Sequence, residues 1–508
     1  MNLLSSSTVF SFYTLISRIL GYIRDILIAF FLGASQLADT FFVAFRLPNT
    51  FRRLFAEATF NSAFIPSLTK ERARGKNFEK KFNDDIFNFL LFCLLFIILL
   101  AEIFTPFLVY LIAPGFINDG EKFLSTIELT RITFPFLLFV TISSFLSAIL
   151  NSYNKFAAAA AAPIVLNIIL ILALFISYFL ELNYAKSLSY GVTFSGIIQM
   201  IILFYFTKKF YKPIIKFKNI LSKKCNKFLK KLLPSIFSSG VTQINILIGT
   251  IIASFEAGAV SYLYYADRVY QINLAIAGIA IGVVSLPILS KAIQRKKENE
   301  ISNIQNKSIE LVILLSTPAS LGLIIAPDEI VNALFGYGSF NKDDIAITAK
   351  ALMFFGYGVP AFALIKVLSN FYFARNNTQT PFYVSCFIVF LNVLISVLFF
   401  KKIGFIIIPI ATSIASWVGV LIFFYLLYNN KYFFVKKSVF INILKIFFST
   451  FLMCIILLKG LNYFSEELLY SNAFKFTYLL FIIISAAIIY LLSCKFLGVF
   501  KLKNYKIN

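Results

Sequence analysis

About fourteen stretches of this chain are apolar and long enough to cross a lipid bilayer, and no other feature restricts its fold as strongly. A membrane-spanning helix needs roughly 20 apolar residues at about 1.5 Å rise per residue. Hydrophobic residues make up 59% of the 508 residues and charged residues only 14%, which excludes a soluble globular protein. We therefore predict an all-α polytopic membrane protein. The predicted spans are 8–33, 37–67, 86–113, 124–152, 158–181, 187–207, 229–255, 258–290, 303–326, 344–373, 381–400, 404–428, 438–460 and 473–497.

The net charge of +24 follows the predicted topology and is not gathered in one domain. Basic runs such as Lys70 to Lys81 and Lys208 to Lys231 follow even-numbered spans, whereas the odd-numbered connections are short and neutral or acidic, except at Lys401-Lys402. This is the positive-inside pattern, so both termini are predicted to be cytoplasmic. The excess charge then indicates orientation and attraction to anionic lipid headgroups, and we expect no nucleic-acid partner.

Cysteine and histidine usage gives no support for metal or nucleophilic chemistry. The five cysteines lie at long spacings without a CxxC pattern, and the chain has no histidine. We expect no disulfide, no metal site, no cofactor and no catalytic residue.

The chain contains an internal repeat. The segment Asp39–Arg46 resembles Ser261–Arg268, and two further matches follow in the same order at nearly the same offset of about 220 residues. This offset covers six predicted helices, an even number, so the two halves would enter the membrane in the same direction. Many transporters consist of two such bundles with the substrate site near the midplane. We predict two parallel six-helix lobes around a central cationic cavity.

The predicted organisation has four parts, namely an N-terminal lobe, a basic cytoplasmic linker, a C-terminal lobe and an appended pair of helices. Their bounds are 1–207, 208–228, 229–428 and 429–508, respectively.

Ten ionisable residues fall inside the first, second and eighth predicted spans, and they form the candidate site. A charge at bilayer depth is costly unless it meets water or a partner, so such residues are functional candidates. Six arginines outnumber four carboxylates, which suggests a hydrated chamber for an anion. The ten are Arg18, Arg24, Asp25, Asp39, Arg46, Arg52, Arg53, Glu57, Asp267 and Arg268.

The arginines are expected to lie in two tiers, because residues equidistant from the turn near 34–36 share a depth. Arg24 pairs with Arg46, and Arg18 pairs with Arg52, with the tiers roughly 9 Å apart at 1.5 Å per residue. The repeat offset places Arg268 level with the first tier. Guanidinium groups suit phosphate because their fixed fork of donors meets two oxygens at once.

The carboxylates have a competing role, since they could neutralise neighbouring arginines while the site is empty. Arg53 and Glu57, at i and i+4, are the clearest such pair. We assign Arg46, Arg53, Glu57 and Asp267 to gating or charge pairing.

At these residues the chain resembles the MurJ (MviN) lipid II flippase family of the multidrug/oligosaccharidyl-lipid/polysaccharide exporter superfamily. The likeness is carried by seven blocks distributed along the chain. They are Ser17–Asp25, Ala38–Asn49, Phe51–Ala58, Ala63–Pro66, Tyr264–Arg268, Phe371–Arg375 and Thr380–Pro381.

The resemblance implies fourteen helices and a cavity that opens alternately to the cytoplasm and the periplasm of the bacterial inner membrane. It also implies transport of the undecaprenyl-pyrophosphate-linked disaccharide-pentapeptide precursor of peptidoglycan. Family members often carry an acidic residue where this chain has Gln271, which puts a proton- or cation-responsive role at that position in doubt. The substrate-binding residues expected from the resemblance and the spacing are Arg18, Arg24, Asp25, Asp39, Asn49, Arg52, Asn167 and Arg268.

Two other functions stay open from the residues. A drug or cation antiporter of the same superfamily would need a net acidic or apolar chamber. A membrane enzyme acting on polyprenyl phosphates would need a poised carboxylate or histidine, usually on a large loop domain. We expect a monomer in contact with membrane lipids and the lipid-linked precursor, with other cell-wall synthesis proteins as further candidate partners.

Overall fold

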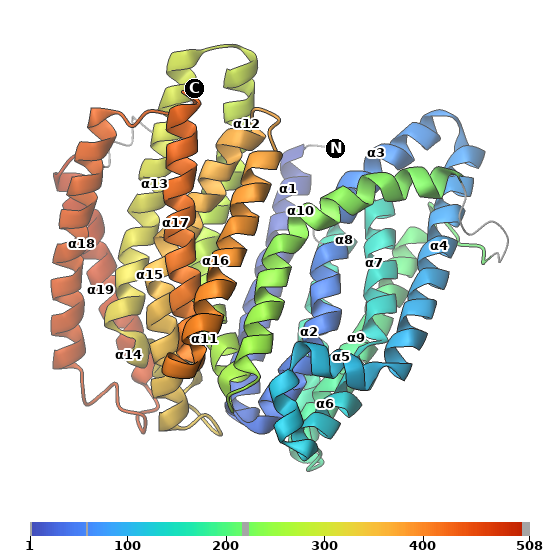
Figure 1. Ribbon diagram of the computed structural model, residues 1–508, viewed down its shortest axis with the longest axis horizontal. Helices are drawn as coiled ribbons and strands as arrows, with labels where there is room; N and C mark the ends of the chain where they lie inside the picture. The colour runs from blue at the N-terminus through green and yellow to red at the C-terminus, as the bar shows by residue number, and fades with distance from the viewer. Residues whose placement is uncertain (1–2, 57–58, 216–222, 500–508) are drawn as a thin grey trace. The chain divides into compact units, whose positions relative to one another are not determined.

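The computed structural model describes residues 3–56, 59–215 and 223–499, and every regular element in these ranges is helical (Figure 1). This confirms the predicted all-α class. Within these ranges, ten candidate spans are long and apolar enough to cross a membrane, so the chain is a multi-pass membrane protein. The number of fourteen crossings stays a prediction.

The chain forms two compact units, Met1–Ser261 and Tyr262–Asn508. The first unit holds α1 to α10 and the first residues of α11. Its elements are α1 (Leu3–Leu32), α2 (Gln36–Ala56), α3 (Thr59–Ala73), α4 (Lys76–Ile103), α5 (Thr105–Ile112), η1 (Pro114–Asn118), α6 (Gly120–Thr133), α7 (Phe136–Ser152), α8 (Phe156–Phe179), α9 (Tyr184–Thr207) and α10 (Lys223–Ala253).

The second unit continues from α11 and includes the two C-terminal helices. Its elements are α11 (Ala259–Leu274), η2 (Ala275–Ile279), α12 (Ala280–Gln294), α13 (Glu298–Ile325), α14 (Pro327–Phe335), α15 (Lys342–Phe373), α16 (Gln379–Ile403), η3 (Gly404–Ile406), α17 (Ile407–Asn429), α18 (Lys437–Tyr463) and α19 (Lys475–Phe496).

Helix α10 packs within the first unit, against α2, α3 and α4. The predicted second lobe begins at residue 229, because its bounds follow the sequence repeat. By packing, α10 belongs to the first unit. The lobe bounds remain a prediction, and the predicted linker 208–228 lies partly outside the described residues.

Several predicted spans are subdivided, among them 86–113, which is divided between α4 and α5, and 124–152, which is divided between α6 and α7. The span 37–67 appears as α2 and α3, on either side of residues 57–58, which lie outside the described ranges. The span 258–290 contains a five-residue π-helical turn, η2, between α11 and α12. Such turns are rare and are found most often at functional sites, and hydropathy carries no signal for them.

Each unit contains its own polar contact of the same type, and the two contacts are related by the predicted offset. In the first unit, the Asn88 side-chain amide donates to the Ile214 carbonyl at 2.9 Å and to the Asp84 carbonyl at 2.7 Å. In the second unit, the Asn306 amide donates to the Phe434 and Ser302 carbonyls, both at 2.9 Å. Each asparagine thus ties its helix to the segment that follows the last helix of its six-helix repeat.

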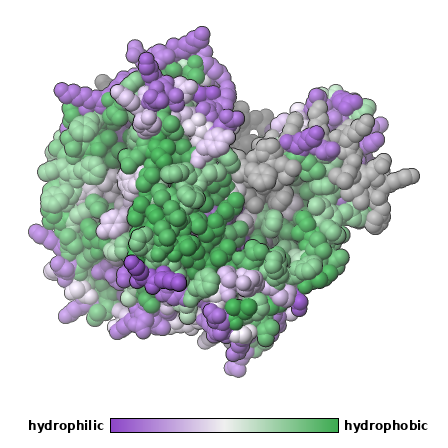
Figure 2. Space-filling view, in the orientation of Figure 1, coloured by the Kyte–Doolittle hydropathy of each residue, from purple (hydrophilic) through white to green (hydrophobic). Residues whose placement is uncertain are grey.

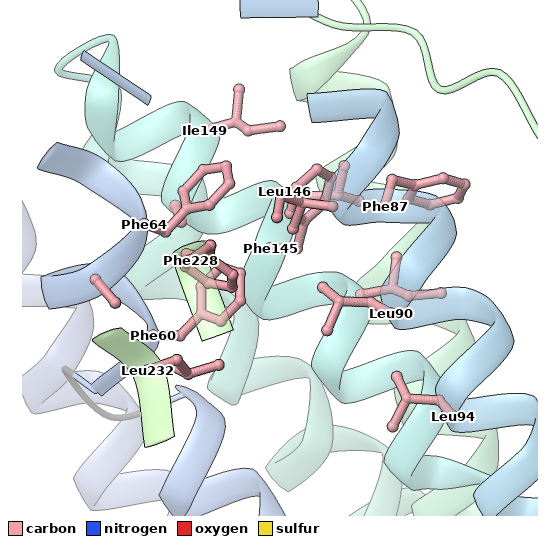
Figure 3. Close-up of a cluster of buried hydrophobic side chains, with 14 of the residues drawn as sticks. Phe60, Phe64, Phe87, Leu90, Leu94, Phe145, Leu146, Ile149, Phe228 and Leu232 are labelled. Carbon is pink, nitrogen blue, oxygen red and sulfur yellow. The ribbon is translucent and has the colours of Figure 1, made fainter. Parts of the chain in front are cut away.

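Phenylalanine side chains fill the core of the first unit where α3, α4, α7 and α10 meet (Figure 3). The rings of Phe64 and Phe145 are 5.4 Å apart, and those of Phe60 and Phe228 are 5.6 Å apart. Helices in lipid associate through close packing, because lipid tails are as apolar as the side chains they would replace. The tight aromatic contacts therefore hold these helices together.

The surface over α16 and α17 is hydrophobic and has polar ends (Figure 2). Its exposed side chains include Phe390, Val397, Leu421 and Tyr425. Contiguous exposed apolar surface of this kind on a helical bundle fits contact with lipid.

We expect Phe145→Ala to lower the free energy of unfolding by about 3 kcal/mol, because it removes a fully buried ring and leaves a cavity. Thermal unfolding of the purified protein in detergent measures the change. Phe96→Ala is the matched control, since Phe96 is 61% exposed on α4. Equal melting temperatures for the two variants would contradict the assigned core.

Candidate functional site

Arg24 on α1 is held by two partners in the first unit. Its Nε and Nη2 donate to Asp25 Oδ1 at 3.0 and 2.7 Å, and its Nη1 donates to Asn167 Oδ1 at 2.9 Å. The amide of Asn167 on α8 in turn donates to the Ser17 carbonyl at 2.9 Å. Arg24 is 8% exposed and Asp25 is 2% exposed. Asn167 therefore fixes the guanidinium plane and links α8 to α1, which the sequence alone did not show.

Asp39 on α2 is fully buried and accepts four hydrogen bonds. Its Oδ2 accepts from Lys122 Nζ at 2.7 Å and from the Gly258 N–H at 2.9 Å. Its Oδ1 accepts from the N–H and the hydroxyl of Ser261 at 2.9 and 2.6 Å. The carboxylate thus binds the ammonium of α6 and the start of α11, where the helix dipole also favours a negative charge.

The turn between α10 and α11 is fixed at a second point by η1. The N–H of Gly115 donates to the Ser254 hydroxyl at 3.0 Å. A Cβ at Gly115 would lie 2.3 Å from the Ser254 carbonyl oxygen, so only glycine allows this approach. Asp39 and Gly115 together hold one short segment, residues 254–261.

Lys122 was missed by the sequence analysis, which began the fourth span at residue 124. Helix α6 begins earlier, at Gly120, and Asp119 caps it by accepting from the Lys122 N–H. Lys122 is 6% exposed, and its ammonium lies 4.0 Å from the ring centre of Phe116. No local signal marks it, because its partner Asp39 is 83 residues away.

The other predicted residues of α2 lie along its second half. Arg52 Nε donates to Asn49 Oδ1 at 3.0 Å, one helical turn away. Arg46, Arg52 and Arg53 are each partly buried. Glu57 lies outside the described residues, so its pairing with Arg53 stays a prediction.

Arg18, on α1, is exposed. It therefore differs from Arg24, six residues further along the same helix, which is buried between its partners.

Arg268 lies in the second unit, on α11, and contacts Tyr264 one turn earlier. Its Nη2 donates to the Tyr264 hydroxyl at 2.9 Å, and its guanidinium carbon is 4.6 Å from the centre of that ring. The neighbouring Asp267 accepts from the side-chain amide of Gln271. Tyr264 was not predicted as a site residue, although its i, i+4 spacing from Arg268 could have indicated the contact.

Of the predicted site, the structure therefore brings together Arg24, Asp25 and Asn167 in one cluster. It places Asp39 in a separate cluster with Lys122. Both clusters belong to the first unit, and each neutralises a buried charge with an opposite charge and with hydrogen bonds, as charges at bilayer depth require.

We expect Lys122→Met to lower the free energy of unfolding by about 3 kcal/mol, because it leaves the buried Asp39 carboxylate without a cation. Asp39→Asn in the Lys122→Met background should recover part of the loss, and thermal unfolding of all four members of this mutant cycle measures it. Lys186→Met is the matched control, because it breaks a pair with Glu128 that is about half exposed, and it should change stability little. Additive effects of the two buried substitutions would contradict the pair.

The family model for the lipid II flippase MurJ matches residues 28–493. A probable lipid II flippase MurJ from Rhizobium tropici is 38% identical over 423 residues, covering 82% of this chain and 79% of the relative. One from Buchnera aphidicola subsp. Baizongia pistaciae is 34% identical and covers 100% of both chains.

Solved structures agree with the sequence relatives. A lipid II flippase MurJ in an inward closed conformation matches with a TM-score of 0.81 and 26% identity, covering 96% of this chain and 98% of that one. An inward-facing multidrug resistance MATE family transporter matches with a TM-score of 0.64 at 14% identity, which shows a shared fold only. The chain belongs to the lipid II flippase MurJ family.

Proposed function

We propose that this protein translocates lipid II, the undecaprenyl-pyrophosphate-linked disaccharide-pentapeptide, from the cytoplasmic to the periplasmic leaflet of the bacterial inner membrane by alternating access. Both termini lie in the cytoplasm in this proposal. The observation that carries it, beside family membership, is the buried Arg24 held in a fixed orientation by Asp25 and Asn167. An oriented guanidinium at bilayer depth suits a diphosphate carried on a lipid.

Binding begins with an exchange of partners at Arg24. In the arrangement described here, Asp25 neutralises the guanidinium through two hydrogen bonds. A substrate phosphate can take the place of Asp25 by accepting from two guanidinium donors at once, while Asn167 keeps the guanidinium in place during the exchange. Arg18 and Arg52 are further cations of the first unit for the same diphosphate, with Arg52 oriented by Asn49.

Arg268 of the second unit supplies another cation for the substrate in this proposal. The ring of Tyr264 supports its guanidinium without neutralising it, because a cation–π contact leaves the charge in place. Alternating access requires an anion that binds one arrangement of the protein better than another. Arginines from two units that act on one substrate provide such a difference.

Asp39 serves the site indirectly in this proposal. Both of its oxygens are occupied by Lys122, Gly258 and Ser261, so it holds the start of α11 and thereby positions the helix that carries Arg268. It is a positioning residue for the substrate site.

The composition of the site also distinguishes the proposal from its alternatives. A drug or cation antiporter would need a net acidic or apolar chamber, whereas the arginines Arg18, Arg24, Arg52 and Arg268 outnumber the carboxylates Asp25 and Asp39. A membrane enzyme would alter its lipid chemically, and the family to which this chain belongs is one of transporters.

Replacing Arg24 or Arg268 by alanine should abolish growth of a bacterial strain that depends on this gene, because each change removes a cation for the diphosphate. Arg24→Lys should fall between alanine and wild type, since lysine keeps the charge but loses the fork of donors. Complementation, with membrane levels checked by immunoblot, measures this.

Arg74→Ala is the control for the arginine series, since the Arg74 side chain is 53% exposed and pairs with Glu71 next to it. It should support normal growth. Normal growth of Arg24→Ala and Arg268→Ala at full expression would refute the binding roles.

Vesicles that contain the purified protein should move labelled lipid II between leaflets and return it chemically unchanged. The fraction of labelled lipid II that an external enzyme can modify measures how much lies in the outer leaflet. Mass spectrometry of the extracted lipid shows whether it is chemically intact. Loss of the diphosphate or of a sugar in a protein-dependent manner would favour the enzyme alternative. Empty vesicles provide the background rate.

A further inference from the structure

Lys366 is an ionisable residue that the sequence analysis did not include. It lies on α15, inside a candidate span that covers Lys342–Phe373. The helix ends seven residues later, so Lys366 lies roughly 10 Å from that end at 1.5 Å per residue. A cation at this depth needs water or an anionic partner.

The position of Lys366 on the helix is defined by its neighbours one turn away. Phe362, one turn earlier, lies 5.5 Å from Tyr270 of α11 between ring centres. Asn370, one turn later, donates to the Gly282 carbonyl of α12 at 2.7 Å. Residues at i, i+4 and i+8 share one side of a helix. Lys366 therefore lies on the side of α15 that follows the continuous helix α11–η2–α12.

Lys366 is exposed, whereas Ala363, Leu364, Val367 and Leu368 around it are buried. Ala363 also packs closely on η2, because a Cβ at Gly278 would lie 2.9 Å from the Ala363 Cα. The seam between α15 and η2 is thus closely packed, and Lys366 lies exposed beside it. Among the residues that the structure describes, no carboxylate forms an ion pair with Lys366.

The distance from Arg268 decides what Lys366 can bind. Lys366 is level with about residue 280, since Ala363 and Asn370 contact Gly278 and Gly282. The 12 residues from Arg268 to Ala280 correspond to roughly 18 Å along the helix. The Arg268 guanidinium contacts Tyr264, one turn further from Lys366, so one diphosphate does not span both cations in this arrangement. Lys366 therefore faces a different part of any substrate that Arg268 holds.

We propose that Lys366 binds a carboxylate of the peptide arm of the substrate headgroup while the arginines hold the diphosphate. This assignment rests on the proposed function, which supplies a headgroup with a pentapeptide. An extended pentapeptide spans at most about 17 Å, which is comparable with the separation between Arg268 and Lys366. A peptide carries at least one carboxylate, at its C-terminus, and an ammonium forms a charge-assisted hydrogen bond with it.

The test compares two probes, namely lipid II and the same undecaprenyl-diphosphate-linked disaccharide without its peptide. Binding of each probe to the full-length protein in detergent is titrated by native mass spectrometry. Lys366→Gln should weaken lipid II binding about tenfold, as expected for the loss of one charge-assisted hydrogen bond, and should leave binding of the peptide-free probe unchanged. Lys366→Arg should restore most of the affinity for lipid II.

Two control variants separate the outcomes. Lys350→Gln removes another exposed lysine of α15 and should change neither affinity. Arg24→Ala should weaken both probes, because both contain the diphosphate.

Three results would overturn the proposal. Unchanged lipid II affinity in Lys366→Gln would show that the lysine only extends toward the lipid headgroups. Equal weakening of both probes would show that it acts on the diphosphate or on folding. Wild-type protein that binds neither probe would refute the proposed function itself, and with it this assignment.

Discussion

A charged side chain inside a membrane-spanning helix must find an opposite charge or enough hydrogen bonds, and the first unit meets this requirement in two places. Arg24 meets it with Asp25 and Asn167, and Asp39 meets it with Lys122 and the start of α11. The same contacts tie α1 to α8 and α2 to α6. The charges that make this chain a candidate anion transporter are therefore also charges that hold its helices in place.

Because these charges also hold helices in place, substrate binding to them affects helix contacts. A cation already satisfied by a carboxylate can bind an anionic substrate only by exchanging partners, and the exchange changes the contacts that position the helices. Arg24 and Asp25 are neighbours on α1, so their pair can separate without moving another helix, while Asn167 of α8 keeps its bond to the Ser17 carbonyl of α1. Asp39 differs, because release of its carboxylate would free both α6 and the start of α11. The first cluster suits ligand exchange, and the second suits control of helix position.

The internal repeat is visible in contacts as well as in sequence. Asn88 and Asn306 make the same type of bond to the segment that follows each six-helix repeat. The repeat is not exact at the charged positions, since Ser261 in the second half corresponds to Asp39 in the first, and here the two residues bind each other. An exchange of acid for hydroxyl at equivalent positions thus creates a hydrogen bond that two identical carboxylates could not make, because like charges would repel.

The sequence by itself determined the helical class and the approximate span positions, and it predicted Arg24, Asp25 and Asn167 as site residues, which the structure places in one cluster. Hydropathy and charge at bilayer depth are properties of local composition, and the family blocks are contiguous runs of residues. Only the tertiary structure decided that Lys122 neutralises Asp39, that η2 lies within the eighth span, and that Lys366 is exposed beside the packed seam of α15 and η2. Each of these depends on how helices distant in sequence pack against one another. The helical period indicates on which side of its own helix a residue lies. Which residue it contacts on that side depends on how the helices pack against one another.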